Sequence, residues 1–230
     1  MIDWHSHILP GMDDGSRDVA ESISLVKMQG EQSVRTVIAT PHFYANDETV
    51  SAFLNRRQKA FDILTPELPA NSPKILLGAE VRYYQGIIRM KDLNDLRIEG
   101  TKLLLLEMPM TGWTEYMVRE LTELSGKSNI QIVLAHIDRY MSLQKQSVWE
   151  RITDSGVLMQ ANASFFTSFA SKRKAISLLK NGNIQLIGSD CHNVTSRPPR
   201  IGKAFDVVRK KFGDYYINQM NEYGYSLLGL

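Results

Sequence analysis

Seven short apolar runs alternate along the chain with longer segments whose apolar residues have helical spacing. The runs cover residues 2–5, 35–40, 74–80, 102–107, 130–136, 157–162 and 184–190. Their length and composition are typical of buried strands. Strands that alternate with helices form a parallel sheet with both faces covered. Seven such units predict an α/β fold whose strands form a closed or nearly closed barrel.

The segments between the runs show the spacing expected of amphipathic helices. Two examples are the sets Val19, Ile23, Val26, Gly30 and Ile201, Phe205, Val208, Phe212. Asp18, with Glu21 three residues later, predicts the start of the first of these helices. The last stretch, residues 215–230, is also expected to be helical, and either caps the barrel or contacts a partner.

Length and charge limit the classes of protein that this chain can belong to. Its 230 residues, 43% of them hydrophobic, suit one domain over residues 1–230. The net charge of +2 does not favour a nucleic-acid partner. A single cysteine, Cys191, excludes an internal disulfide. Runs such as 103–106 are too short to be embedded in a membrane, and no leader is visible, so we expect a cytoplasmic protein.

Residue types that can bind metals stand at or just after the end of nearly every predicted strand. In chain order they are His5, His7, His42, Glu80, Glu107, His136, Asn162, Asp190 and His192. All five histidines of the chain are in this set. The carboxyl ends of parallel strands meet at one face of the fold, and active sites form there. The sequence therefore predicts one cluster of imidazoles and carboxylates at the carboxyl ends of the strands.

Local spacing adds detail to this predicted cluster. His5 and His7 are two residues apart, so their side chains are expected to leave the strand on one side, with Trp4 on the other. Asp190 and His192 repeat this spacing. Imidazole and carboxylate ligands without thiolate suit manganese, iron or zinc in an open catalytic site.

Several motifs together resemble the polymerase and histidinol phosphatase (PHP) superfamily. They are His5-Ser6-His7, Thr40-Pro41-His42, Gly78-Ala79-Glu80, Leu106-Glu107, Ala135-His136-Ile137-Asp138-Arg139-Tyr140 and Ser189-Asp190-Cys191-His192-Asn193. The opening ten residues, followed by Met12-Asp13-Asp14-Gly15, resemble one branch more closely. That branch contains the manganese-dependent protein-tyrosine phosphatases of bacterial capsule and exopolysaccharide clusters. The resemblance covers the chain to about Arg200.

The resemblance implies a distorted (β/α)7 TIM-like barrel that holds three metal ions, with manganese expected and iron or zinc as alternatives. The implied ligands are His5, His7, Glu80 and Asp190 for one ion, Glu80, Glu107 and His136 for a second, and Asp14, His42 and His192 for the third. Glu80 would bridge the first two ions. Arg139 and Arg197 match the phosphate-binding arginines of the family. Asp138 is a departure, since the branch often has Glu there.

The activity implied is hydrolysis of phosphotyrosine, with the tail of a bacterial tyrosine kinase as the expected partner. Adjacent metal ions neutralise a phosphate and lower the pKa of a bridging water, whose hydroxide attacks phosphorus. Arg139 and Arg197 would grip the nonbridging oxygens through paired donors. The leaving phenol has a pKa of about 10, so a strong general acid is not required. Asp138 is more simply explained as a turn residue.

Other functions fit parts of the sequence. A histidinol phosphatase or another small-molecule phosphomonoesterase would use the same ligands, and a non-catalytic metal-binding regulatory domain would keep them without turnover. A nuclease is disfavoured because no basic groove or aromatic stripe is visible. Cys191 and Arg197 have the C-x5-R spacing of cysteine-dependent phosphatases. The loop between them lacks the glycine that a phosphate-wrapping backbone needs, and Pro198 follows the arginine.

Overall fold

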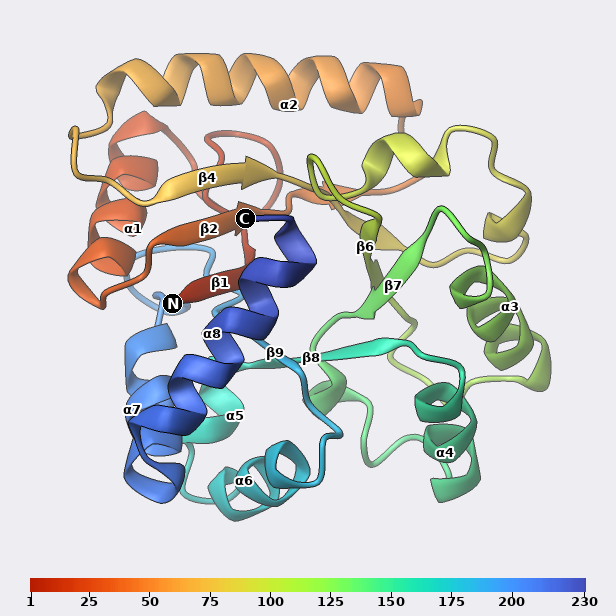
Figure 1. The fold of residues 1–230 in the computed structure, drawn as a ribbon. Coiled ribbons are helices and arrows are strands. Elements are labelled where there is room, and N and C mark those ends of the chain that lie inside the picture. Colours follow the sequence, from red (N-terminus) through yellow and green to blue (C-terminus); the bar gives the residue numbers. More distant parts are fainter.

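Nine parallel strands surround the centre of the molecule in the computed structural model, which describes residues 1–230 (Figure 1). They are β1 (Ile2–Ser6), β2 (Thr36–Ala39), β3 (His42–Phe43), β4 (Lys74–Leu77), β5 (Glu80–Arg82), β6 (Leu103–Glu107), β7 (Gln131–Leu134), β8 (Leu158–Asn162) and β9 (Leu186–Gly188). One sheet has the order β1-β2-β4 and the other β3-β5-β6-β7-β8-β9. Each predicted run overlaps at least one of these strands.

Two of the seven predicted strands are each followed by a second short strand beyond a break, and this accounts for the number nine. Between β2 and β3 stands Pro41, which has no amide hydrogen to donate to a neighbouring strand. Gly78 and Ala79 separate β4 from β5. A parallel bridge between Ser6 and Cys191 links β1 to the chain after β9. The strands therefore occupy seven positions around a nearly closed ring, which confirms the predicted barrel.

Eight α-helices cover the outside of the ring and one of its ends (Figure 1). They are α1 (Val19–Glu31), α2 (Val50–Leu64), α3 (Glu115–Ser125), α4 (Gln146–Asp154), α5 (Ala163–Thr167), α6 (Lys172–Lys180), α7 (Ile201–Phe212) and α8 (Asp214–Leu228). As predicted, Asp18 caps α1, because its side chain accepts a hydrogen bond from the Glu21 amide at 2.9 Å. None of these helices has the length and apolar character needed to cross a bilayer.

The alternation of side chains along the strands divides the core in two. In β6, Leu104 and Leu106 belong to a core of 50 buried residues that lies largely between strands and helices. Leu103 and Leu105 belong to a second core of 11 residues, which fills the barrel. Its members are Ile2, Trp4, Ile38, Leu76, Ile98, Leu103, Leu105, Val133, Ala135, Leu186 and Leu228. Leu228 comes from α8, so the C-terminal helix closes one end of the barrel. This is the first of the two roles expected for residues 215–230.

A bulge in β1 changes the direction of its side chains. Asp3 pairs with Val37 and Ser6 pairs with Ala39, so two residues of β1 oppose one residue of β2. Bulges of this kind re-aim side chains beside active sites. Trp4 packs inside the barrel, and His5 also points inward, to within 3.1 Å of Glu80 on β5. The expectation that Trp4 leaves the strand opposite to His5 is therefore wrong.

We expect truncation inside the barrel to cost more stability than truncation at the surface. Leu105 is buried in the barrel interior, whereas Leu143 is 41% exposed. Leu105→Ala should lower the free energy of unfolding by about 2–5 kcal/mol, because it removes buried methyl groups and leaves a cavity. Leu143→Ala should change it by less than about 0.5 kcal/mol. Urea denaturation measures both, and equal losses would contradict the assignment of the interior core.

Candidate metal centre

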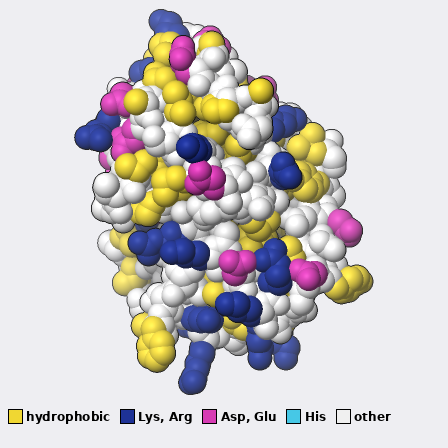
Figure 2. All heavy atoms as spheres, turned by 90° about the vertical axis from the view of Figure 1, so that its left-hand side faces the viewer, with side chains coloured by type: hydrophobic (Ala, Val, Ile, Leu, Met, Phe, Trp, Pro, Cys, Tyr) yellow, Lys and Arg dark blue, Asp and Glu magenta, His cyan; other side chains and the backbone are white.

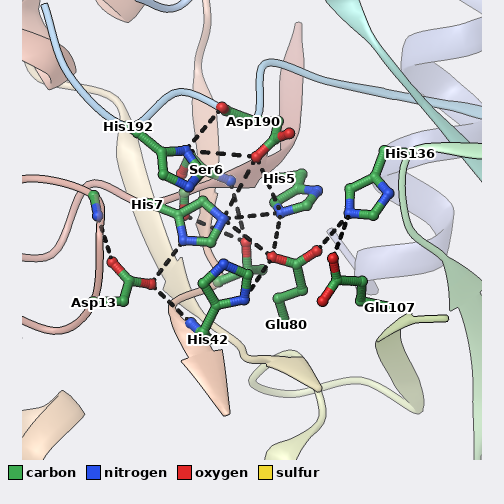
Figure 3. A network of polar contacts seen from close by, with 12 residues as sticks. His5, Ser6, His7, Asp13, His42, Glu80, Glu107, His136, Asp190 and His192 are labelled. Atoms are coloured by element: carbon green, nitrogen blue, oxygen red, sulfur yellow. Dashed lines mark hydrogen bonds and ion pairs between the residues drawn. The ribbon is translucent and has the colours of Figure 1, made fainter. Parts of the chain in front are cut away.

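The carboxylate of Glu80 lies at the centre of a cluster of histidine rings at the carboxyl end of the barrel (Figure 3). Its oxygens lie 3.1 Å from His5 Nε2, 3.2 Å from His7 Nε2, 3.1 Å from His42 Nδ1 and 2.8 Å from His136 Nε2. His42 and Glu80 are also direct partners in the register of β3 and β5. Residues that are far apart in the sequence thus meet around one carboxylate. This is what their positions at the carboxyl ends of the predicted strands indicated.

Three further carboxylates complete the cluster. Asp190 Oδ1 lies 3.7 Å from His5 Nε2 and 3.6 Å from His7 Nε2. Glu107 Oε1 lies 3.7 Å from His136 Nε2. The more exposed Asp14 places its Oδ1 3.3 Å from His192 Nε2 and 3.6 Å from His42 Nε2. The structure thus brings together all nine predicted metal ligands.

Ligand atoms within 4.8 Å of one another form three overlapping groups. They are His7, Asp14, His42 and His192; then His5, His7 and Asp190; and then His42, Glu80 and Glu107. The three sets implied by the family resemblance differ in detail. His7 belongs to two groups rather than one. His42 belongs to the group of Glu80 and Glu107 as well as to the group of Asp14. His136 contacts Glu80 but lies outside these groups.

The donor atoms fit a metal centre better than a hydrogen-bonded cluster. His5 Nε2 and His7 Nε2 face each other at 3.1 Å beside the same carboxylates. His42 Nδ1 and His192 Nε2 are buried without a hydrogen-bond partner, although carboxylate oxygens lie at 3.1 and 3.3 Å. Buried polar atoms without partners are rare in native proteins. Imidazole nitrogens and carboxylate oxygens that converge in this way are the ligands of divalent transition metals.

The charges of the cluster support this interpretation. Burial alone would raise the pKa of Glu80, but the neighbouring histidines, His5 and His136 among them, hold it well below its usual range. Burial likewise opposes ionisation of Asp190, yet His5, His7 and Arg139 keep its pKa below the ordinary value. Both carboxylates are therefore ionised, as a metal ligand must be.

Two residues outside the predicted set hold the histidine rings in place. Asp13 Oδ2 lies 2.7 Å from His7 Nδ1 and accepts a hydrogen bond from the His42 amide at 2.8 Å. Gln160 Oε1 lies 3.3 Å from His5 Nδ1 and accepts from the His136 amide at 2.7 Å. Such partners fix the ring nitrogen that faces a metal. The signals available in the sequence were the position of Asp13 next to Asp14, and of Gln160 two residues before Asn162.

The backbone around the cluster is tightly constrained. A Cβ atom on Gly15 would lie 2.4 Å from His7 Cβ, and one on Gly188 would lie 2.6 Å from His5 Cβ. Only glycine therefore fits beside these two histidines. His136 and Asp190 both have positive φ angles, 33° and 53°. Residues held in such sparsely populated conformations cluster at active sites.

The two predicted arginines lie beside the cluster and line a cavity of about 250 Å³. The Arg197 guanidinium donates to Asp190 Oδ1 at 2.9 Å, and Arg139 contacts the other oxygen of the same carboxylate. Both arginines are about one third exposed. The remaining lining residues are Asn162, Ser164, Ser189, Asp190, Ser196, Pro198 and Arg200. Three cationic side chains in one polar cavity make it suitable for an anion.

Three residues near the cluster are not among its predicted ligands. Asp138 accepts a hydrogen bond from the Asn162 amide at 2.9 Å, which supports its role as a turn residue. Phe43 is fully buried against the ring of Phe53, in the packing at the barrel rim. Tyr44 is partly exposed, and its ring stacks on His42 with 5.2 Å between ring centroids.

The cysteine-dependent alternative is not supported by the surroundings of Cys191. The side chain is fully buried. Burial, with the carboxylate of Asp3 nearby, raises the pKa of the thiol far above its usual range. Arg197 points to Asp190 instead. A buried, protonated thiol cannot act as the nucleophile, so the C-x5-R spacing is coincidental.

Comparison with known proteins identifies one family. The family model described as capsular polysaccharide synthesis, CpsB/CapC, matches residues 1–223. The tyrosine-protein phosphatase YwqE of Bacillus subtilis is 31% identical over 226 residues, which is 93% of this chain and 85% of that protein. The tyrosine-protein phosphatase CpsB of Streptococcus agalactiae is 30% identical over 243 residues, with 96% and 94% covered.

Solved structures show the same relationship. The structures of YwqE from Bacillus subtilis and CpsB from Streptococcus pneumoniae, described as metal-dependent tyrosine phosphatases, match with a TM-score of 0.81 and 27% identity. That match covers 99% of this chain and 94% of the other. Histidinol phosphate phosphatase from Lactococcus lactis matches with a TM-score of 0.59 at 14% identity, covering 92% and 93%. This second likeness concerns the fold alone.

We expect Asp13 to contribute to metal affinity although it is not a predicted ligand. Asp13→Ala would free the His7 ring to rotate, and loss of such a partner weakens metal binding by about 10–100-fold. Titration of metal-free protein with Mn²⁺ measures the change. The matched control is Asp154→Ala, which removes an exposed carboxylate at the last residue of α4, near the start of β8 and so away from the carboxyl ends of the strands. Equal affinities in the two variants would show that Asp13 does not orient His7.

Proposed function

The chain belongs to the CpsB/CapC family of capsular polysaccharide synthesis, and we propose that it is a metal-dependent protein-tyrosine phosphatase. The observation that carries the proposal is the convergence of four imidazoles on Glu80 beside a cavity lined by arginines. The relatives that are at least 30% identical are named as tyrosine-protein phosphatases. The likeness to a histidinol phosphate phosphatase, at 14% identity, shows a common fold and carries no argument about activity.

We propose that the three groups of ligand atoms hold up to three divalent ions within the single domain formed by residues 1–230. The proposed ligands are His5, His7, Asp14, His42, Glu80, Glu107, His136, Asp190 and His192. Glu80 is shared, since its two oxygens face different histidines. Manganese is the proposed metal, and the same nitrogen and oxygen donors accept iron or zinc. Bound divalent cations supply positive charge to a phosphate and lower the pKa of coordinated water.

Arg139 and Arg197 are proposed to bind the phosphate. Asp190 contacts both guanidinium groups, so they are held at the edge of the cavity before substrate enters. Each still has donors free, and planar paired donors match the oxygens of a phosphoryl group. Negative charge on these oxygens in the transition state would strengthen both contacts, which lowers the barrier.

The aromatic leaving group explains why no acid is needed at the cavity. A phenolate leaves without prior protonation more readily than a serine alkoxide, because the pKa of phenol is about 10. Asp138 is engaged by the Asn162 amide, so it is not assigned the role of acid. Tyr44, partly exposed and stacked on His42, is positioned to contact the phenyl ring of a substrate.

The proposed partner is a phosphotyrosine protein, and specifically the tail of a bacterial tyrosine kinase of capsule or exopolysaccharide synthesis. The family description, capsular polysaccharide synthesis, supports this setting. A polar cavity that opens to solvent accepts a phosphotyrosine from an extended chain. We place this encounter in the cytoplasm, in keeping with a single unpaired cysteine.

The first test removes the metal and compares substrates. Protein stripped with chelator should be inactive, and added Mn²⁺ should restore hydrolysis of a phosphotyrosine peptide above that of a phosphoserine peptide or histidinol phosphate. Cys191→Ser should retain activity, because the thiol is buried away from the cavity. Preference for histidinol phosphate would move the function to small-molecule hydrolysis. Activity that survives chelation and is lost in Cys191→Ser would overturn the metal-dependent function.

The second test concerns the arginines. Arg139→Lys and Arg197→Lys should each lower kcat/KM for a phosphotyrosine peptide by roughly 100-fold, because lysine keeps the charge but loses the paired donors. Arg119→Lys, at an exposed ion pair on α3, should leave kcat/KM unchanged. Steady-state kinetics on Mn²⁺-loaded proteins decides, with metal content measured alongside. If both site variants retained full activity, the arginines would have no part in phosphate binding.

A further inference from the structure

Positive charge is distributed unevenly in this nearly neutral chain. Residues 155–189 contain four Lys or Arg residues and no Asp or Glu. All four cations lie on α6, at positions 172, 173, 174 and 180. On the face drawn in Figure 2, which includes the side of the molecule that carries α7, Lys and Arg side chains gather in the lower half. The net charge of +2 thus conceals a strongly basic surface.

A groove between α6 and α7 lies in this basic surface. It has a volume of about 670 Å³, and nine residues line it: Phe169, Lys172, Arg173, Ile176, Ser177, Lys180, Val207, Lys210 and Lys211. Ile176 and Val207 are half-buried and supply apolar surface. Phe169 is fully exposed at the groove. An apolar groove surrounded by cations is typical of a surface that binds a partner.

The five cations of this groove have no acidic partners. None of them lies within 4.0 Å of a carboxylate oxygen, although the chain forms ion pairs elsewhere. Arg209, the residue before Lys210 on α7, is different because it forms ion pairs with Asp206 and Asp214. Like charges that face one groove repel one another. An anionic ligand would remove that repulsion, so the charge of the groove is complementary to an acidic partner.

Two segments of the chain run from the cavity of the metal centre to the groove, although no residue lines both. α5 follows Asn162, which lines the cavity, and Phe169 of the groove is two residues beyond the end of α5. Arg200 lines the cavity and is the N-cap of α7, whose later residues line the groove. A peptide that leaves the cavity past α5 can therefore reach the groove.

We propose that this groove binds an acidic stretch of the phosphoprotein substrate next to the phosphotyrosine that enters the metal centre. The inference rests on the proposed phosphatase function. An apolar side chain of that stretch packs against Phe169 and Ile176, while its carboxylates face Lys172 and Lys210. The nine residues of α6 span about 13 Å, the length of roughly four extended residues. A concave groove suits a peptide better than the flat surface of a bilayer.

Direct binding tests the groove without any catalysis. The probe is a fluorescent, unphosphorylated peptide rich in Asp and Glu with one Phe, and its anisotropy reports binding to the metal-loaded protein. The variant K172Q/R173Q/K210Q/K211Q should bind about tenfold more weakly, since each exposed ion pair contributes a few tenths of a kcal/mol. The matched control K27Q/K59Q/K74Q/K91Q removes four exposed lysines elsewhere and should bind within about twofold of wild type.

Kinetics then connects the groove to the substrate. For a phosphotyrosine peptide with an acidic extension, the groove variant should raise KM about tenfold and leave kcat unchanged. Hydrolysis of p-nitrophenyl phosphate should be the same in all three proteins. Equal KM values for groove and control variants would overturn the proposal even if phosphatase activity is present.

Two other outcomes separate this proposal from the proposed function. The first outcome is that none of the three proteins hydrolyses phosphotyrosine, while the acidic peptide binds the wild type and binds the groove variant more weakly. The phosphatase function then fails and the acidic-peptide site stands. If the groove variant instead loses only its binding to phosphatidylserine vesicles, and peptide binding is unchanged, the groove faces a membrane and the proposal is wrong.

Discussion

The burial of the Glu80 carboxylate is the constraint on which the rest of the structure depends. Its oxygens lie 2.8–3.2 Å from ring nitrogens of four histidines. A buried charge is costly unless it is compensated by opposite charge or bound metal. The compensation comes from residues far apart in the sequence, so it exists only when the strands have the correct register. The cluster around Glu80 therefore forms only when the barrel is folded.

Because side chains alternate along each strand, the inward face of one strand carries both core residues and residues of the metal cluster. On β6, Leu103 and Leu105 fill the barrel interior, and the next residue on that face is Glu107 in the metal cluster. On β8, Leu158 packs toward the interior, while Gln160 and Asn162 contact the ligands. The same inward face thus changes from apolar to polar toward the carboxyl end. This arrangement keeps the cluster rigid and partly shielded from water, which strengthens its electrostatic interactions.

The sequence predicted the barrel and the meeting of the candidate ligands because both follow from local patterns. Apolar runs define strands, and parallel strands bring their carboxyl ends together. The β1 bulge was not predictable, because it depends on pairing between β1 and β2. Asp13 and Gln160 were missed because their roles depend on contacts made only in the folded chain. The expectation that the chain has no basic groove was wrong, because the net charge averages over the whole surface and does not show where the cations gather.

We propose that divalent ions occupy the space between Glu80 and the surrounding histidines. Anomalous diffraction at the manganese absorption edge, from crystals of Mn²⁺-loaded protein, would locate such ions. We expect anomalous peaks within coordination distance of Glu80, of the His5–Asp190 group and of the His42–His192 group. Full Mn²⁺ loading in solution with no peak near Glu80 would contradict this proposal, because the cluster would then be held together by hydrogen bonds alone.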